Sequence, residues 1–117
     1  MKWPNDIYLN DKKIAGILVE AGISGKKVDW FVVGVGLNVN QELFSAPRAT
    51  SLKLEGTVIT SKWQLLEEIA LQFEQKIEII NIREDKLIQD YYKNLRWKEE
   101  WHTFENEHFE QFEGKIL

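Results

Sequence analysis

The sequence has 117 residues, of which 44% are hydrophobic and 29% charged. This composition is typical of a folded domain of ordinary size and excludes an intrinsically disordered chain. The sequence has no cysteine, which excludes a disulfide framework and a thiolate metal site. The longest apolar run, residues 30–37, is too short to span a bilayer, and the N-terminus has no signal-like apolar segment. We therefore expect a cytoplasmic protein.

The charges are unevenly distributed along the chain. Residues 1–53 carry seven Lys/Arg and five Asp/Glu, a net charge of +2, whereas residues 54–117 carry eight and fourteen, a net charge of −6. An acidic protein is a poor candidate for non-specific nucleic-acid binding, so we expect no nucleic-acid partner. The mildly basic half is the place to look for an anionic ligand. Chance asymmetry between two solvated surfaces explains the same numbers equally well.

The N-terminal third predicts a β-meander. Residues 7–9 form a short strand that ends at the turn-forming pair Asn10-Asp11, and residues 14–20 form a longer apolar strand. A loop that begins at Gly22 and continues to Lys27 then leads into a third strand, residues 28–39. Because these strands are apolar on both faces, they should need covering layers on both sides.

The remainder predicts mainly helix. After a loop over residues 40–60, Thr60 or Ser61 caps a helix that runs to about residue 80, and a second helix covers residues 84–95. A β-hairpin follows, with strands at 101–104 and 112–117. The fold class is therefore α+β, in which a mixed β-sheet built around the meander packs against helices. The side chains expected to face inward from the helices are Leu66, Ile69, Ala70, Phe73, Ile77, Ile80, Leu87, Ile88, Tyr91, Tyr92 and Leu95.

Lys13 and a set of strand glycines are the first candidates for a binding site. A lysine at the start of an apolar strand can simply extend its ammonium group to solvent. However, Gly16 follows within the same strand, where glycine is costly unless something approaches the backbone closely, and Gly34 and Gly36 recur in the third strand. In a meander these glycines can line one shallow groove, which would suit a ligand with a flat head and an anionic tail.

Other polar residues near these strands extend the candidate site. Lys2, Asn5, Asp6 and Asn38 suit the positioning and charge neutralisation of a phosphate or acyl-phosphate. Asp6 is a candidate ligand for nucleotide-associated Mg²⁺, although no metal site is certain. A structural turn at Asn5-Asp6, or a turn at Asn38, remains an alternative. The sequence offers no nucleophilic triad, no Walker loop and no complete dinucleotide fingerprint.

Three blocks together resemble biotin protein ligases. These blocks are KWPNDIY (residues 2–8), KKIAGILVE (residues 12–20) and VVGVGLNVN (residues 32–40), in that order and at this spacing. The resemblance implies that residues 1–95 are the second half of a class II synthetase-like ligase domain. It also implies that residues 96–117 open a small SH3-like barrel, since WHTF and FEGKIL are similar to its first strands.

The resemblance implies a two-step reaction. Biotin and MgATP give biotinyl-5′-adenylate, and the biotin then passes to a lysine of a biotin carboxyl carrier domain. Lys13 would be the catalytic lysine, which contacts the biotin carboxylate and the adenylate phosphate. Biotin would also be bound by Gly16, Leu18, Gly34 and Leu37, and the nucleotide by Lys2, Asn5, Asp6 and Asn38. Strict strand alternation places Lys13 and Gly16 on opposite faces, so this scheme needs a bulge or a contact through the backbone alone.

The resemblance also implies that this chain is a fragment. The glycine- and arginine-rich loop of the family precedes the KWPND block and is absent here, so we expect the chain alone to be inactive. A homodimer and an N-terminal DNA-binding domain remain open. Two alternatives also remain: a lipoate ligase or octanoyltransferase, and a non-catalytic binding or assembly module.

Overall fold

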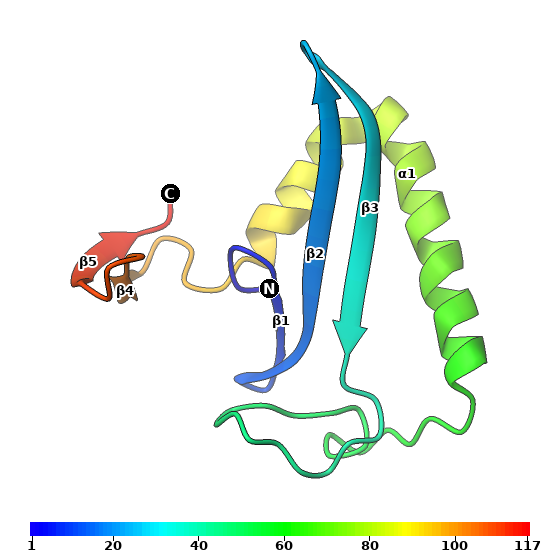
Figure 1. Ribbon diagram of the computed structural model, residues 1–117, viewed down its shortest axis with the longest axis vertical. Coiled ribbons are helices and arrows are strands. Elements are labelled where there is room, and N and C mark those ends of the chain that lie inside the picture. The colour runs from blue at the N-terminus through cyan, green and yellow to red at the C-terminus, as the bar shows by residue number, and fades with distance from the viewer.

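The computed structural model describes the backbone of residues 1–117 and the side chains of residues 1–80 and 82–117. Its strands and helix follow one another in the order shown in Figure 1. Among the described residues, no helix combines the length and the apolar content that a membrane crossing requires. The elements are β1 (Asp6–Leu9), β2 (Lys12–Ser24), β3 (Lys27–Leu37), α1 (Lys62–Lys93), β4 (Trp101–Glu105) and β5 (Gln111–Lys115).

The predicted meander is confirmed, but the prediction of a mixed sheet is wrong. The sheet has the order β1-β2-β3, and each neighbouring pair is antiparallel. The physical reason is that the connections are tight turns, which can join only antiparallel neighbours. Asn10 and Asp11 both have positive φ values, 47° and 63°, as the turn between β1 and β2 requires.

The β2–β3 hairpin is longer than predicted. Gly22, which we expected to begin the loop, pairs with Trp30, and β2 continues to Ser24. The Trp30 indole lies over Gly22, in space that any Cβ atom at residue 22 would occupy. This glycine therefore accommodates a cross-strand aromatic ring and does not end the strand.

The two predicted helices are confirmed as two segments of α1. Ser61 is the N-cap, and its hydroxyl accepts a hydrogen bond from the Gln64 backbone N–H at 3.3 Å. The helix breaks at Arg83, whose φ and ψ of −147° and 57° are not helical. The second segment ends at Lys93, slightly earlier than predicted, because Asn94 caps it.

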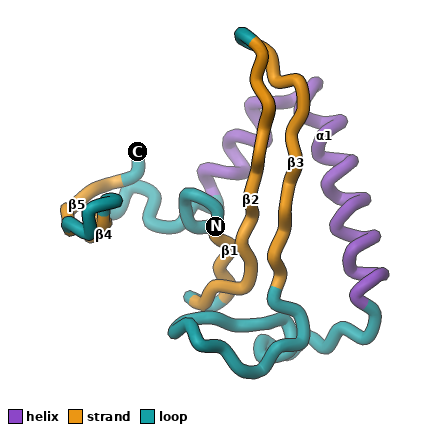
Figure 2. Tube along the Cα trace, viewed as in Figure 1, coloured by secondary structure: helices purple, strands orange, loops and turns teal.

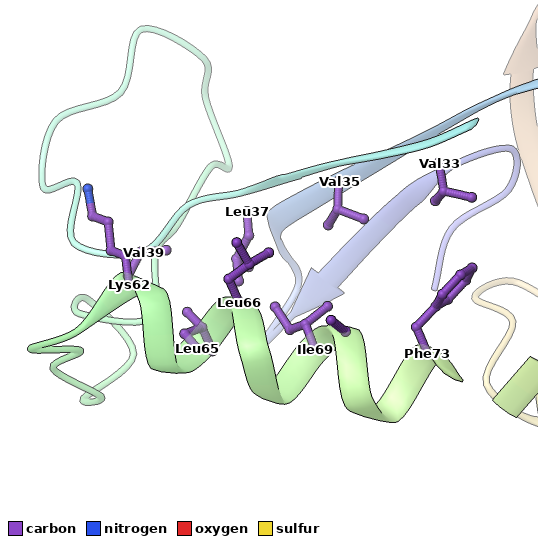
Figure 3. Close-up of a pocket in the computed structure, with 10 residues that line it drawn as sticks. Val33, Val35, Leu37, Val39, Lys62, Leu65, Leu66, Ile69 and Phe73 are labelled. Atoms are coloured by element: carbon purple, nitrogen blue, oxygen red, sulfur yellow. The ribbon is translucent and has the colours of Figure 1, made fainter. Parts of the chain in front are cut away.

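The first segment of α1 lies beside one face of β3 and leaves a groove between them. Figure 3 shows Val33, Val35 and Leu37 directed toward the helix. From the helix, Leu66, Ile69 and Phe73 point back toward β3. The predicted apolar stripe therefore faces the sheet, but Phe73 is still 45% exposed and Leu66 53%. The groove lacks the converging polar groups typical of a ligand site, and we interpret it as a loosely filled packing interface.

The best-buried part of the molecule lies where the loop over residues 38–61 crosses the sheet. Figure 2 shows this loop folded across the end of the sheet that carries the β1–β2 turn. Thr50 and Ser51 of the loop have no exposed surface, and Ile14 and Ala15 of β2 are only 5% and 6% exposed. The small core is thus centred beside Lys13.

The predicted C-terminal hairpin is confirmed. β4 and β5 pair from Trp101↔Lys115 to Glu105↔Gln111, and Phe104 stacks on Phe112 at a centroid distance of 5.8 Å. The hairpin stands apart from the three-stranded sheet (Figure 1). Trp101 is 69% exposed, so the hairpin buries little of its aromatic surface.

We predict that these 117 residues self-associate when they are isolated. Large side chains on the β2–β3 hairpin are exposed, including Leu18, Trp30, Phe31 and Val32. Exposed apolar sheet surface recruits other chains. Light scattering should show species larger than a monomer at micromolar concentration, and a stable monomer would contradict the prediction.

Candidate functional site

A β-bulge places Lys13 on the same face of the sheet as Gly16. Asp6 pairs with Gly16 and Ile7 with Ala15, but the next residue of β1, Tyr8, pairs with Lys13, so that Ile14 is the extra residue. The bulge reverses the alternation that otherwise directs Lys13 and Gly16 to opposite faces. A Cβ atom built on Gly16 would lie 3.8 Å from both Cε and Nζ of Lys13. The conflict noted in the sequence is thereby resolved.

Asp6 completes a charged group above Gly16. Its Oδ1 lies 2.5 Å from Lys13 Nζ, and the Asp6 side chain is only 21% exposed. Asp6 and Gly16 are directly paired across β1 and β2, so the carboxylate and the ammonium lie over the same stretch of backbone. A partly buried ion pair of this kind holds the lysine side chain in one orientation, whereas a fully solvated lysine is free to move.

The strand glycines continue this face, as predicted. Gly36 pairs with Gly16, and Gly34 pairs with Leu18. The nearest atoms to a Cβ on Gly34 or Gly36 are at 3.8–4.0 Å, so this surface has room above the backbone. A flat, mainly apolar ligand can therefore lie against the strands here, with its anionic end at Lys13. We refer to Asp6, Lys13, Gly16, Gly34 and Gly36 as the glycine face.

Residues 48–50 form hydrogen bonds with the Lys13 backbone, along the edge of β2 that β3 does not reach. Lys13 N donates to Arg48 O at 2.7 Å, and Thr50 N donates to Lys13 O at 2.9 Å. Together they form a parallel bridge between Lys13 and Ala49. β3 ends at Leu37, where Asn38 N donates to Ile14 O at 2.9 Å, and residues 48–50 take its place beside β2.

A polar network around Glu55 ties this segment to the β1–β2 turn. Glu55 Oε1 accepts a hydrogen bond from Thr50 Oγ1 at 2.7 Å, and Glu55 Oε2 accepts one from Asn10 Nδ2 at 2.6 Å. Lys12 Nζ lies 3.6 Å from Glu55 Oε1. The hydrogen bond from Thr50 is the largest cause that lowers the pKa of Glu55, followed by the bond from Asn10.

We predict that Glu55→Gln lowers the free energy of unfolding at pH 7. The variant should also lose less of this free energy than the wild type when the pH falls to 3. Because the folded-state pKa of Glu55 is lowered, its ionised form stabilises the fold above the ordinary glutamate pKa. This contribution is lost as the pH falls through the lowered pKa. Urea unfolding at pH 7 and pH 3 should show a smaller difference for Glu55→Gln than for the wild type. Glu67→Gln, on the exposed surface of α1, is the matched control.

A group of cations and aromatic rings lies next to the glycine face. Arg96 Cζ is 5.1 Å from the Tyr8 ring centroid and 5.3 Å from that of Trp97, and Lys2 Nζ is 4.8 Å from the Trp97 ring. Arg96 also pairs with Asp11 at 2.5 Å across 85 residues of sequence. Sequence reasoning missed Tyr8, Arg96 and Trp97, since the sequence signals only that Arg96 and Trp97 are adjacent.

The structure brings together some of the predicted site residues but not all. Lys13, Gly16, Leu18, Gly34 and Asp6 share one face of the sheet. Leu37 pairs with Ala15 on the opposite face and lines the groove under α1.

The predicted polar residues around this face have structural contacts of their own. Asn38 donates its side-chain amide to Thr50 O at 3.0 Å. The Asn5 carbonyl accepts a hydrogen bond from Ile17 N at 2.9 Å, which continues the β1–β2 pairing. Lys2 is directed toward the Trp97 ring.

The chain is similar in sequence to several named ligases. Residues 1–38, which contain β1, β2 and β3, match the biotin/lipoate A/B protein ligase family. The bifunctional ligase/repressor BirA of Bacillus spizizenii is 36% identical over 81 residues, which cover 65% of this chain and 25% of that protein. The biotin–[acetyl-CoA-carboxylase] ligase of Paracoccus denitrificans is 51% identical over 39 residues, 33% of this chain and 16% of that protein. In sequence, this chain is similar to biotin protein ligases.

The solved structures of biotin protein ligases share the fold. The Aquifex aeolicus ligase in complex with biotin and ATP matches with a TM-score of 0.74 and 24% identity, over 100% of this chain and 49% of that one. The apo structure of the ligase from the same organism matches with a TM-score of 0.70, over 52% of its length. The chain thus spans about half of these ligase structures, and a quarter of BirA from Bacillus spizizenii.

Proposed function

We propose that this chain contributes the lysine-bearing half of the active site of a biotin protein ligase. The observation that carries the proposal is the bulge in β2, which places the Lys13 ammonium and the Asp6 carboxylate over Gly16. The sequence relatives support the choice of reaction, since they include enzymes named as biotin–[acetyl-CoA-carboxylase] ligases. ATP as a substrate is consistent with the cytoplasmic location expected from the sequence.

In the first step a carboxylate oxygen of biotin attacks the α-phosphorus of ATP. The bond between the α-phosphorus and the bridging oxygen to the β-phosphate breaks, and pyrophosphate leaves with that electron pair. Negative charge accumulates on the α-phosphate oxygens as the bond forms. The Lys13 ammonium has three donors, so it can keep Asp6 at 2.5 Å and still donate to the biotin carboxylate and the phosphate.

The glycine face supplies the surface for the rings of biotin. Gly16 and Gly34 leave room above the strands, and Leu18, which is 60% exposed, offers apolar contact beside them. Leu37 would support this wall from the opposite face of β3, where it lies against α1. Of the predicted biotin-binding residues, we expect Leu37 to contribute packing and no direct contact.

The nucleotide would lie toward Lys2, Asn5, Asp6 and Asn38. The Lys2 ammonium is held over the Trp97 ring and can reorient toward a phosphate. Asn38 would act mainly by fixing Thr50, to which its amide is already bonded.

Asp6 is the carboxylate of this face that would contact magnesium. Lys13 already pairs with Asp6 Oδ1, so Asp6 could offer Mg²⁺ only its other oxygen. Such a site would suit an ion that is held mainly by the nucleotide phosphates and water, with at most one protein carboxylate. Bound there, Mg²⁺ would withdraw charge from the phosphates. Among the described side chains, no cluster of three or more His, Asp or Glu could hold a metal without that help.

In the second step a lysine amine of a biotin carboxyl carrier domain attacks the acyl carbon of the adenylate, and AMP leaves. The β2–β3 hairpin continues beyond the glycine face with exposed side chains, which would be accessible to such a partner or to a second copy in a homodimer. We further propose that residues 1–95 belong to a class II synthetase-like ligase domain. Residues 96–117, which contain β4 and β5, would then begin an SH3-like barrel.

A lipoate ligase or octanoyltransferase is the second candidate, because the matching family includes both biotin and lipoate ligases. Calorimetry on the complete ligase domain that contains this chain separates the two. Binding of biotin at micromolar concentration, with ATP-dependent transfer of labelled biotin to a carrier domain, would support the proposal. Binding of lipoate in preference to biotin would overturn it, and binding of neither would favour a non-catalytic module.

A further inference from the structure

Thr50 is buried beside Lys13 and makes hydrogen bonds to three other residues. It has no exposed surface. Its N–H donates to Lys13 O at 2.9 Å, its hydroxyl donates to Glu55 Oε1 at 2.7 Å, and its carbonyl accepts from Asn38 Nδ2 at 3.0 Å. Thr50 thus joins the bulged strand, the end of β3 and the Glu55 network.

The bulge needs such a support. A bulged residue interrupts the regular hydrogen-bond ladder and can shift to the alternative register. In the regular register the Lys13 side chain would point to the opposite face, away from Asp6 and Gly16. Residues 48–50 bond both the N–H and the carbonyl of Lys13 and so fix the residue on which the bulge depends.

We propose that Thr50 is a positioning residue for the ligase reaction, which holds the β2 bulge and thereby keeps the Lys13 ammonium on the glycine face. The inference rests on the proposed function. The Thr50 hydroxyl is the critical group, because its bond to Glu55 anchors residues 48–50 to the β1–β2 turn through Asn10. The backbone bonds to Lys13 depend on where that anchor places residues 48–50.

The test uses Thr50→Val, which keeps the shape of the side chain and removes its hydroxyl, in the complete ligase domain. A displacement of about 1 Å at a reacting group costs roughly 100-fold, so we expect kcat for adenylate formation to fall about ten- to 100-fold. KM for biotin should change less than about threefold, since Gly16, Leu18 and Gly34, which are proposed to contact the rings of biotin, are retained. Thr50→Ser keeps the hydroxyl and should restore kcat to within about threefold of the wild type.

Two further variants test whether the effect is specific to the bond between Thr50 and Glu55. Thr57→Val makes the same change at an exposed threonine of the same loop and should leave kcat unchanged. If Thr50→Val does not fold, Glu55→Gln tests the same anchor and should lower kcat in the same direction, with KM retained.

The possible results separate this inference from the proposed function. Unchanged kcat in folded Thr50→Val, together with a large loss in Lys13→Ala, would overturn the positioning role and leave the ligase proposal intact. Equal losses in Thr50→Val and Thr50→Ser would also overturn it, because a hydroxyl would then not suffice. A wild-type domain without any adenylate formation would overturn the proposed function itself.

Discussion

Replacing Lys13 with alanine in the complete ligase domain is expected to lower the rate of biotinyl-adenylate formation by about 100- to 1000-fold. Removal of one preorganised donor to a developing negative charge typically has an effect of this size. The Lys13 ammonium is partly exposed and its described charge partner is Asp6, so its loss should leave the strand pairing intact. Pyrophosphate release from biotin and ATP measures the step directly.

Two companion variants separate charge from structure. Lys26→Ala removes the same charge at the exposed turn between β2 and β3, and its rate should match the wild type. Lys13→Arg keeps the charge on a longer, planar group and should give an intermediate rate. Near-normal turnover of Lys13→Ala, with the fold confirmed by circular dichroism, would remove Lys13 from the mechanism.

Gly16→Val is expected to weaken biotin binding by about ten- to 100-fold and ATP binding much less. A Cβ atom at residue 16 has room, since its nearest neighbours on Asp6 and Lys13 are 3.8 Å away. The two methyl groups of valine extend beyond that position and would occupy the space above the strand. Overfilling a packed site typically costs about 1–3 kcal/mol, which corresponds to this loss of affinity.

Calorimetry with each ligand provides the measurement. Gly16→Ala should be close to the wild type, because its Cβ makes only ordinary contacts. Ala21→Val adds the same methyl groups to the opposite face of β2, where Ala21 pairs with the exposed Phe31, and should bind biotin normally. Equal losses of biotin and ATP affinity in Gly16→Val would indicate general unfolding and would contradict the assignment of this glycine.

Features that depend on a few neighbouring residues could be predicted from the sequence. Asn10 and Asp11 adopt the positive φ values that a tight turn requires, and few other residue types tolerate them. Ser61 caps α1 because its hydroxyl meets the N–H of Gln64 in the same turn. The break at Arg83 falls in the gap left between the two predicted helices.

Burial was predicted less well, because it depends on which surfaces meet. Strand and helix periodicity identified the apolar stripe of α1, yet Phe73 and Leu66 remain about half exposed. The same reasoning overlooked Thr50 and Ser51, which are the most buried of the described side chains although they are polar. The Thr50 hydroxyl donates to Glu55 Oε1 and the Ser51 hydroxyl donates to the Gln41 carbonyl, which compensates that burial, and a local pattern does not reveal such partners.

The sequence by itself determined the order of the strands, the turn between β1 and β2, and the residue types at the site: a lysine, an aspartate and small residues on strands. It did not determine that Lys13 and Gly16 share a face, since an uninterrupted strand separates them. Only the tertiary structure decided this, because Ile14 is displaced from the ladder and residues 48–50 bond the Lys13 backbone. The approach of Arg96 to Tyr8 likewise depends on two segments that are distant in sequence and meet only after folding. Local interactions fix the backbone conformation of each element, whereas the side chains that come together are fixed by contacts between distant segments.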